Sequence, residues 1–136
     1  MAVPANLKYF NASEFHKDPS RADAELCRAL DAVRAKAGIP IHVHVCFATD
    51  GHSSKSWHYQ GKAVDFHFSA GLSLSRELSL LVLSPFGGIG FYPHWSPRPG
   101  WHVDMRPHPR LFWIGEKDGS YSYFNDVNDF KKAIGL

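Results

Sequence analysis

The sequence predicts an α+β fold, in which a small, mainly antiparallel sheet carries helices on one face. Three observations predict this class. Several short segments alternate apolar and polar residues, as half-buried strands do, and others repeat apolar residues every three or four positions, as amphipathic helices do. Two aromatic-rich runs near the C-terminus flank an Asp-Gly turn signal, which is typical of a β-hairpin. We expect the functional site in a cleft on the sheet face opposite the helices.

The N-terminal part of the chain should supply scaffold. Residues 8–10 are expected to be extended, and residues 11–15 to form one helical turn. Asp18 is a suitable N-cap for the main helix, with Pro19 at its first position, and Gly38 suits its end. The apolar stripe of this helix consists of Leu26, Leu30, Val33 and Ala37.

Residues 41–47 alternate as the next strand, with Cys46 on the same face as His42 and His44. A His-x-His pair on a strand can bind metal, so these two histidines form a rival metal site. The alternative is that they are polar groups on the outer face of the sheet or beneath a neighbouring element.

The second half of the chain continues with strands and helices in turn. Strands are expected at residues 63–68, 89–92 and 101–106, and helices at residues 72–83 and 127–134. In the first of these helices the leucines should face inward and Glu77 should face solvent. Asp118 and Gly119 suit the turn of a hairpin formed by residues 110–115 and 120–124. The aromatic side chains of this hairpin either cover the sheet or form a carbohydrate-binding strip.

Composition limits the function classes. The 136 residues, 44% hydrophobic and 21% charged, predict one globular domain spanning residues 1–136, which we expect to act as a monomer. A formal net charge of +2 is too small to indicate nucleic-acid binding. We find no apolar run long enough for a membrane span and no N-terminal apolar signal, so we expect synthesis in the cytoplasm and no membrane insertion. Cys27 and Cys46 are then expected to be free, buried thiols.

One stretch, Ser56 to Asp65, organises the candidate site. It places His58 and Asp65 on either side of Gly61, which lets the chain turn tightly because glycine has no Cβ. In the strand that follows, alternation directs Asp65 to the face opposite the apolar residues. The turn can therefore bring His58 back beside Asp65.

A second strand supplies the remaining candidate ligand. In residues 101–106, His102 and Asp104 share one face, and the apolar residues share the other. Two histidine nitrogens and one carboxylate oxygen, from His58, Asp65 and His102, with a fourth position left for water, are typical of a catalytic zinc site. Zinc is therefore the expected cofactor.

The string Ser-x-His-x-x-Gly-x-Ala-x-Asp, followed by a strand with His-x-Asp, resembles the M15 family of zinc peptidases. That family includes D-Ala-D-Ala carboxypeptidases and L,D-endopeptidases of bacteria and phages, and the Hedgehog signalling domain, whose zinc-binding region is similar, shares its fold. The resemblance implies a Hedgehog/DD-peptidase-like fold, zinc held by His58, Asp65 and His102, and hydrolysis of peptide bonds in peptidoglycan stem peptides. It also implies that His52 lies beside the metal, where it could polarise the substrate or stabilise the oxyanion.

Two departures from the family pattern bear on the mechanism. Many relatives carry a Glu or Asp three residues before the last histidine as general base, and here that residue is Pro99. Asp104 is then either the base or a partner that orients a ligand histidine. Many relatives also carry a substrate-binding arginine on the strand before the motif. Residues 45–50 contain none, which favours cleavage inside a peptide over a strict carboxypeptidase.

The loop at residues 93–100 immediately precedes the last ligand strand and should border the site. Trp95 could stack on substrate or act as a packing lid, and Arg106 is a candidate to bind a substrate carboxylate. His94 and Arg98 are candidates for a proton donor and a second carboxylate-binding group.

Two further function classes fit the same residues. One is a zinc-binding module without catalysis, and the other is a structural component of a phage particle that retains the fold for adhesion. A protein made in the cytoplasm reaches peptidoglycan only if something releases or delivers it, as happens with phage lysis and tail proteins. A phage-encoded origin is consistent with that requirement.

Overall fold

The computed structural model describes residues 6–52 and 56–136 and has an α+β fold built on a six-stranded sheet. The strands are β1 (Ile41–Val45), β2 (Ala63–Phe68), β3 (Gly88–Tyr92), β4 (Gly100–Asp104), β5 (Leu111–Gly115) and β6 (Tyr121–Phe124), in the order β1-β2-β4-β3-β5-β6. The helices are α1 (Ala24–Ala37), α2 (Leu74–Val82) and α3 (Val127–Ala133), with 3-10 turns η1 (Ala12–Glu14), η2 (Pro19–Arg21) and η3 (Trp57–Gln60). Of the five strand pairings in the described part of the chain, only β3 with β5 is parallel, which confirms the expected mainly antiparallel sheet.

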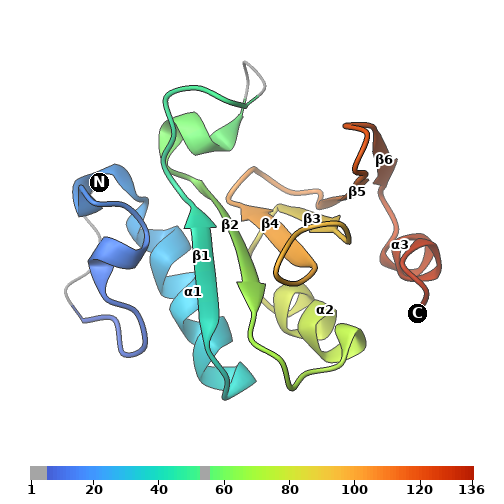
Figure 1. The fold of residues 1–136 in the computed structure, drawn as a ribbon, viewed down its shortest axis with the longest axis horizontal. Helices are drawn as coiled ribbons and strands as arrows, with labels where there is room; N and C mark the ends of the chain where they lie inside the picture. Colours follow the sequence, from blue (N-terminus) through green and yellow to red (C-terminus); the bar gives the residue numbers. More distant parts are fainter. Residues whose placement is uncertain (1–5, 53–55) are drawn as a thin grey trace.

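Helices α1 and α2 lie on the same face of the sheet, and the main core fills the space between (Figure 1). Leucines of both helices pack there with alternate residues of the central strands, among them Phe66, Trp101 and Val103, all fully buried. Because successive strand residues point to opposite faces, the residues between these core positions project from the other face. In the described part of the chain, every helix is too short or too polar to cross a bilayer.

The main helix starts later than the sequence predicts. Asp18 and Pro19 begin only the short turn η2, and α1 starts at Ala24, capped by the side chain of Asp23. Between them Ala22 is extended and buried, and the Asp23 backbone N–H donates to the carbonyl oxygen of Gly61 at 2.9 Å. This tertiary bond interrupts the helical run and ties it to the motif turn. The predicted C-terminal glycine cap is confirmed, since Gly38 has a φ of 70°.

Two positions predicted to face solvent or the outer sheet face are buried instead. Glu77 is buried, because its carboxylate accepts a 2.9 Å hydrogen bond from Trp101 Nε1 and lies 3.9 Å from an Arg98 nitrogen. Cys46 does not share the face of His42, because the strand register shifts after Val43 and β1 ends at Val45. The expectation that both cysteines are free and buried is confirmed.

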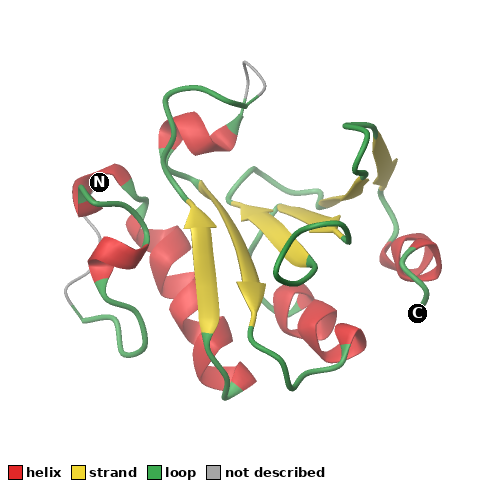
Figure 2. Ribbon diagram, in the orientation of Figure 1, coloured by secondary structure: helices red, strands yellow, loops and turns green. Residues whose placement is uncertain are grey.

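The predicted C-terminal hairpin is confirmed, with Gly119 in its turn at a φ of 88°. Phe112 and Trp113 are buried, as a covering role requires, but Tyr121 and Tyr123 remain 52% and 61% exposed. Helix α3 packs beside the hairpin, where Phe130 stacks on Phe112 with ring centroids 5.0 Å apart (Figures 1 and 2).

Candidate metal centre

The motif turn is built around a glycine that no other residue could replace without strain. Ser56 caps η3 by accepting from the His58 backbone N–H, and Gly61 ends it with a φ of 67°. A Cβ on Gly61 would overlap the backbone carbonyl oxygen of Arg21. The turn is thus held tightly against the N-terminal segment, and η3, which carries His58, packs against β2.

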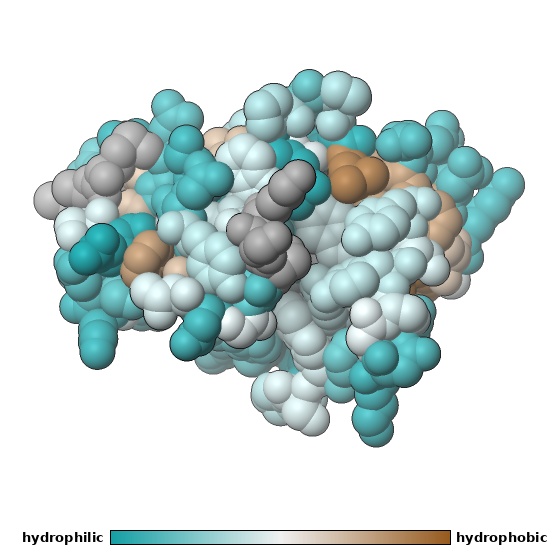
Figure 3. All heavy atoms as spheres, turned by 90° about the horizontal axis from the view of Figure 1, so that it is seen from above, coloured by the Kyte–Doolittle hydropathy of each residue, from teal (hydrophilic) through white to brown (hydrophobic). Residues whose placement is uncertain are grey.

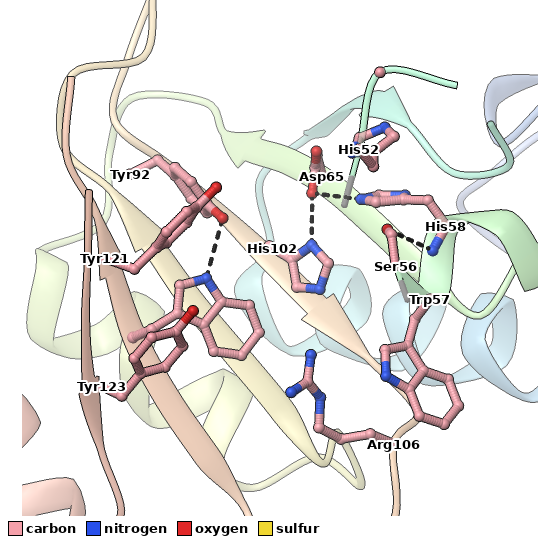
Figure 4. A pocket seen from close by; sticks show the side chains of 12 residues that line it. His52, Ser56, Trp57, His58, Asp65, Tyr92, His102, Arg106, Tyr121 and Tyr123 are labelled. Carbon is pink, nitrogen blue, oxygen red and sulfur yellow. Dashed lines mark hydrogen bonds and ion pairs between the residues drawn. The ribbon is translucent and has the colours of Figure 1, made fainter. Parts of the chain in front are cut away.

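The pairing of β2 with β4 brings the second predicted ligand strand next to the motif turn. β2 and β4 are antiparallel, and Asp65 pairs directly with His102 across them. Their side chains project from the face opposite the core, as the alternation predicts. His58, from the turn, completes a cluster drawn from three separate segments (Figure 4).

The three side chains converge on one point. Asp65 Oδ1 lies 3.1 Å from His58 Nε2 and 2.9 Å from His102 Nδ1, and one potential ligand atom from each residue lies within 4.8 Å of the other two. This group, which is largely buried, could therefore hold a metal ion. Two imidazoles and a carboxylate suit zinc, and the same donors also suit ferrous iron.

The far nitrogen of each histidine already has an acceptor. His58 Nδ1 lies 2.7 Å from the backbone carbonyl oxygen of Cys46, and His102 Nε2 lies 2.8 Å from Asp104 Oδ2. Because a carbonyl oxygen only accepts, His58 Nδ1 carries the proton. The nitrogens that face Asp65 are then the ones left to bind a metal, which is the arrangement that orients histidine ligands in metalloproteins. The donor set fits a divalent metal ion.

Asp104 is locked behind His102. Its side chain is 0% exposed and receives two hydrogen bonds from the Arg106 guanidinium, Nε to Oδ1 at 2.8 Å and Nη2 to Oδ2 at 2.7 Å. The Arg106 backbone N–H adds a third at 3.1 Å. Burial opposes the ionised carboxylate, but the bonds from His102 and Arg106 outweigh it and lower the pKa of Asp104 to about 2. Gly88 packs directly against the Asp104 carboxylate, and a Cβ at this position would overlap it.

The charges of the cluster are strongly coupled. Burial disfavours the imidazolium of His102, but hydrogen bonds to Asp104 and Asp65 outweigh it and raise the pKa of His102 to about 9. Burial likewise disfavours the Asp65 carboxylate, yet its bonds from His102 and His58 hold the pKa of Asp65 far below its ordinary value. A metal ion that binds here must displace a proton from His102.

The cluster forms part of the wall of an open pocket of about 490 Å³. The lining residues are Gly51, His52, Ser56, Trp57, His58, Asp65, Tyr92, His102, Arg106, Trp113, Tyr121 and Tyr123. His52 stacks on His58 with ring centroids 4.3 Å apart, and its backbone is held by the Tyr59 hydroxyl, which donates to the His52 carbonyl at 2.7 Å. Burial and the neighbouring His58 lower the pKa of His52, so its ring is neutral near pH 7.

The structure places the other candidate residues differently. Arg106 lines the pocket, with its guanidinium 4.8 Å from the centre of the Trp113 ring. Trp95 is not among the described lining residues, because it stacks on Tyr92 with ring centroids 4.3 Å apart. Arg98 is turned away as well and donates to the Phe68 carbonyl at 3.1 Å.

The rival His-x-His pair does not join the cluster. His44 Nε2 lies 2.6 Å from His67 Nδ1, and His42 Nε2 lies 2.7 Å from Ser69 Oγ. Within residues 6–52 and 56–136, the metal-compatible group is His58, Asp65 and His102.

Sequence reasoning missed two aromatic residues that line the pocket. Trp57 lies next to a ligand in the motif, and Tyr92 ends β3. A strand-end aromatic is a weak signal, because only the tertiary pairing of β3 with β4 and β5 brings Tyr92 to this face.

Comparison of the sequence with models of known protein families and with curated proteins found no match.

Proposed function

We propose that the protein is a zinc-dependent peptidase that hydrolyses peptide bonds of peptidoglycan stem peptides, with a Hedgehog/DD-peptidase-like fold similar to that of the M15 family. The observation that carries the proposal is the convergence of His58, Asp65 and His102 in the wall of an open pocket. These three residues come from the string and the strand on which the family resemblance rests.

Zinc held by these residues would lower the pKa of a bound water to about 7 and polarise the scissile carbonyl. The chain's own groups would do the rest. Asp104 positions His102: it is fully buried and engaged by His102 and Arg106, so it has no free access to substrate. His52, neutral and exposed to the pocket, is the group that can accept a proton or donate its N–H to the developing oxyanion.

The electrostatics of Arg106 favour an internal peptide bond as the target. Among the described lining residues, Arg106 carries the cationic side chain besides the histidines. Asp104 neutralises its guanidinium through two charge-assisted hydrogen bonds. A free C-terminal carboxylate would meet little net positive charge there. We therefore propose endopeptidase rather than carboxypeptidase action.

One observation favours a second candidate, a zinc-binding module without catalysis. Among the described lining residues, the carboxylate side chain is that of Asp65, which the proposal assigns as a metal ligand. Pro99 occupies the position of the family's general base, and Asp104 is buried and hydrogen-bonded to His102. Catalysis would therefore depend on His52.

Purified muropeptides distinguish the two candidates. The protein is incubated with them with and without a chelator, and the products are read by mass spectrometry. The enzyme proposal expects new termini at one stem-peptide bond, lost with the chelator and in His58→Ala but retained in His94→Ala, whose exposed histidine does not line the pocket. Stoichiometric zinc without cleavage would support the binding module, and stoichiometric iron would contradict both.

A further inference from the structure

Four aromatic side chains form a wall of the pocket beside the metal-compatible cluster; we call Tyr92, Trp113, Tyr121 and Tyr123 the aromatic wall. Figure 4 shows Tyr92 and Tyr121 beside His102, with Tyr123 farther along β6, the strand that also carries Tyr121. The rings of Tyr121 and Tyr123 are nearly parallel, with centroids 6.1 Å apart and an interplanar angle of 26°. Both belong to the edge strand β6 and face the pocket, although each is more than half exposed.

The sheet is shaped to hold the inner part of this wall. Trp113 Nε1 donates to the Tyr92 hydroxyl at 3.0 Å, which fixes the two rings against each other. A Cβ on Gly90 would overlap the Trp113 indole, and a Cβ on Gly115 would overlap the Tyr92 ring. Two glycines inside strands therefore make room for these aromatics, at a cost in strand stability that a purely packed core would not need.

The wall is amphipathic and carries no free charge. Each of its rings has a flat apolar face and a polar hydroxyl or N–H at the edge. Two groups that can carry positive charge lie against Trp113, and both are paired with carboxylates: Arg106 with Asp104, and His102 with Asp65 and Asp104. Seen from above, pale residues of intermediate hydropathy lie beside brown, hydrophobic areas on the side of β5 and β6, with teal, hydrophilic residues at the rim (Figure 3).

A matching ligand is flat, neutral and amphipathic. A hexopyranose ring fits this description, because its axial C–H groups form an apolar face that stacks on an aromatic ring while its hydroxyls lie at the rim. Aliphatic side chains would not use the polar ring edges, and the four residues of the wall offer no charged side chain to an anion or a cation. The pocket volume lies in the range typical of small-molecule sites.

We propose that the aromatic wall binds a sugar ring of the glycan strand, so that the stem peptide attached to that sugar reaches the metal centre. The identity of the glycan as peptidoglycan rests on the proposed function, but sugar binding by the wall does not. The protein would then prefer peptides that are still linked to glycan, and would act near the sugar-proximal end of the stem.

A binding experiment tests the wall separately from catalysis. β-1,4-linked N-acetylglucosamine oligomers are titrated into metal-free His102→Ala protein, and tryptophan fluorescence is followed because Trp113 belongs to the wall. We expect saturable binding that weakens roughly tenfold in Tyr121→Ala and in Tyr123→Ala but is largely kept in the corresponding phenylalanine variants, which retain the ring. Tyr9→Ala, at a tyrosine that is 48% exposed and does not line the pocket, is the matched control and should bind as the parent does.

A kinetic experiment gives the second readout, the ratio of kcat/KM for glycan-linked stem peptide to kcat/KM for free stem peptide. We expect this ratio to exceed one and to fall in Tyr121→Ala and Tyr123→Ala. Absence of oligosaccharide binding, or equal binding by the alanine variants, would overturn the inference even if stem peptides are cleaved. Oligosaccharide binding without any cleavage would support the wall and defeat the proposed peptidase. A loss of self-association in the alanine variants, without sugar binding, would assign the wall to a second copy of the chain and overturn the inference.

Discussion

His102 bridges two carboxylates: its Nδ1 lies 2.9 Å from Asp65 Oδ1, and its Nε2 lies 2.8 Å from Asp104 Oδ2. One side of the ring therefore faces the candidate metal position, and the other is held by a residue that solvent does not reach. This division gives Asp65 and Asp104 different roles, although both are acids on the same face of neighbouring strands.

The role of Asp104 is tested by Asp104→Asn. If Asp104 orients His102, the variant should lose metal affinity by about 10- to 100-fold, measured by competition with a chromogenic chelator. Asp118→Asn, at the exposed hairpin turn, should leave the affinity unchanged. A variant that binds metal normally but has lost hydrolysis would instead identify Asp104 as the general base.

Metal binding should be linked to proton release from His102. Because the pKa of His102 is raised to about 9, the ring carries a proton at lower pH that the metal must displace. We expect the apparent metal affinity to rise about tenfold per pH unit between about pH 6 and 8, and to level off near pH 9. Calorimetry in buffers of different ionisation enthalpy measures the number of protons released. A pH-independent affinity would contradict the bridge between the two carboxylates.

The buried Glu77 should make stability depend on pH. Burial raises the pKa of Glu77, so the folded state holds its proton after the unfolded chain has lost it. The free energy of unfolding contributed by this group therefore falls as pH rises above the ordinary value of 4.5.

Glu77→Gln removes this titration while keeping an acceptor for Trp101 Nε1. We expect the variant to gain stability relative to the parent as pH is raised from about 4 to about 7, in urea unfolding. The exposed variant Glu116→Gln controls for the change in net charge. A stability difference between Glu77→Gln and the parent that stays constant over this range would show that Glu77 is not the source.

The motif turn is tested by comparing two glycines with positive φ. At Gly119 an added Cβ meets nothing within 4 Å, so Gly119→Ala should cost only the strained backbone, about 1 kcal/mol. At Gly61 the Cβ would also overlap the Arg21 carbonyl, so Gly61→Ala should cost at least about 3 kcal/mol and weaken metal binding by displacing His58. Equal costs at the two positions, or unchanged metal binding in Gly61→Ala, would count against the turn as the support of the site.

The parts of the structure that the sequence predicted depend on local rules. The alternation in β2 and β4 assigns Asp65 and His102 to one face, and Gly61 marks the turn that returns His58 to them. Alternation and turn chemistry act over a few residues, so they can be recognised without knowing how the chain packs.

The parts that were missed depend on tertiary partners. Glu77 lies on a helix face that looks solvated until Trp101 is placed beneath it, and α1 begins late because Asp23 bonds to Gly61. Trp95 does not line the pocket, because its ring stacks on that of Tyr92. The first two outcomes are set by residues far away in the sequence, whereas Trp95 and Tyr92 are close in sequence and meet through the turn that follows β3.

Metal content measured by mass spectrometry of the purified protein tests the central claim most directly. We expect about one zinc ion per chain in the parent and in His42→Ala, and loss of the metal in His58→Ala, Asp65→Ala and His102→Ala that remain folded by circular dichroism. Full metal occupancy in any of these three folded variants, or loss of the metal in His42→Ala alone, would contradict the assignment of the metal to this cluster.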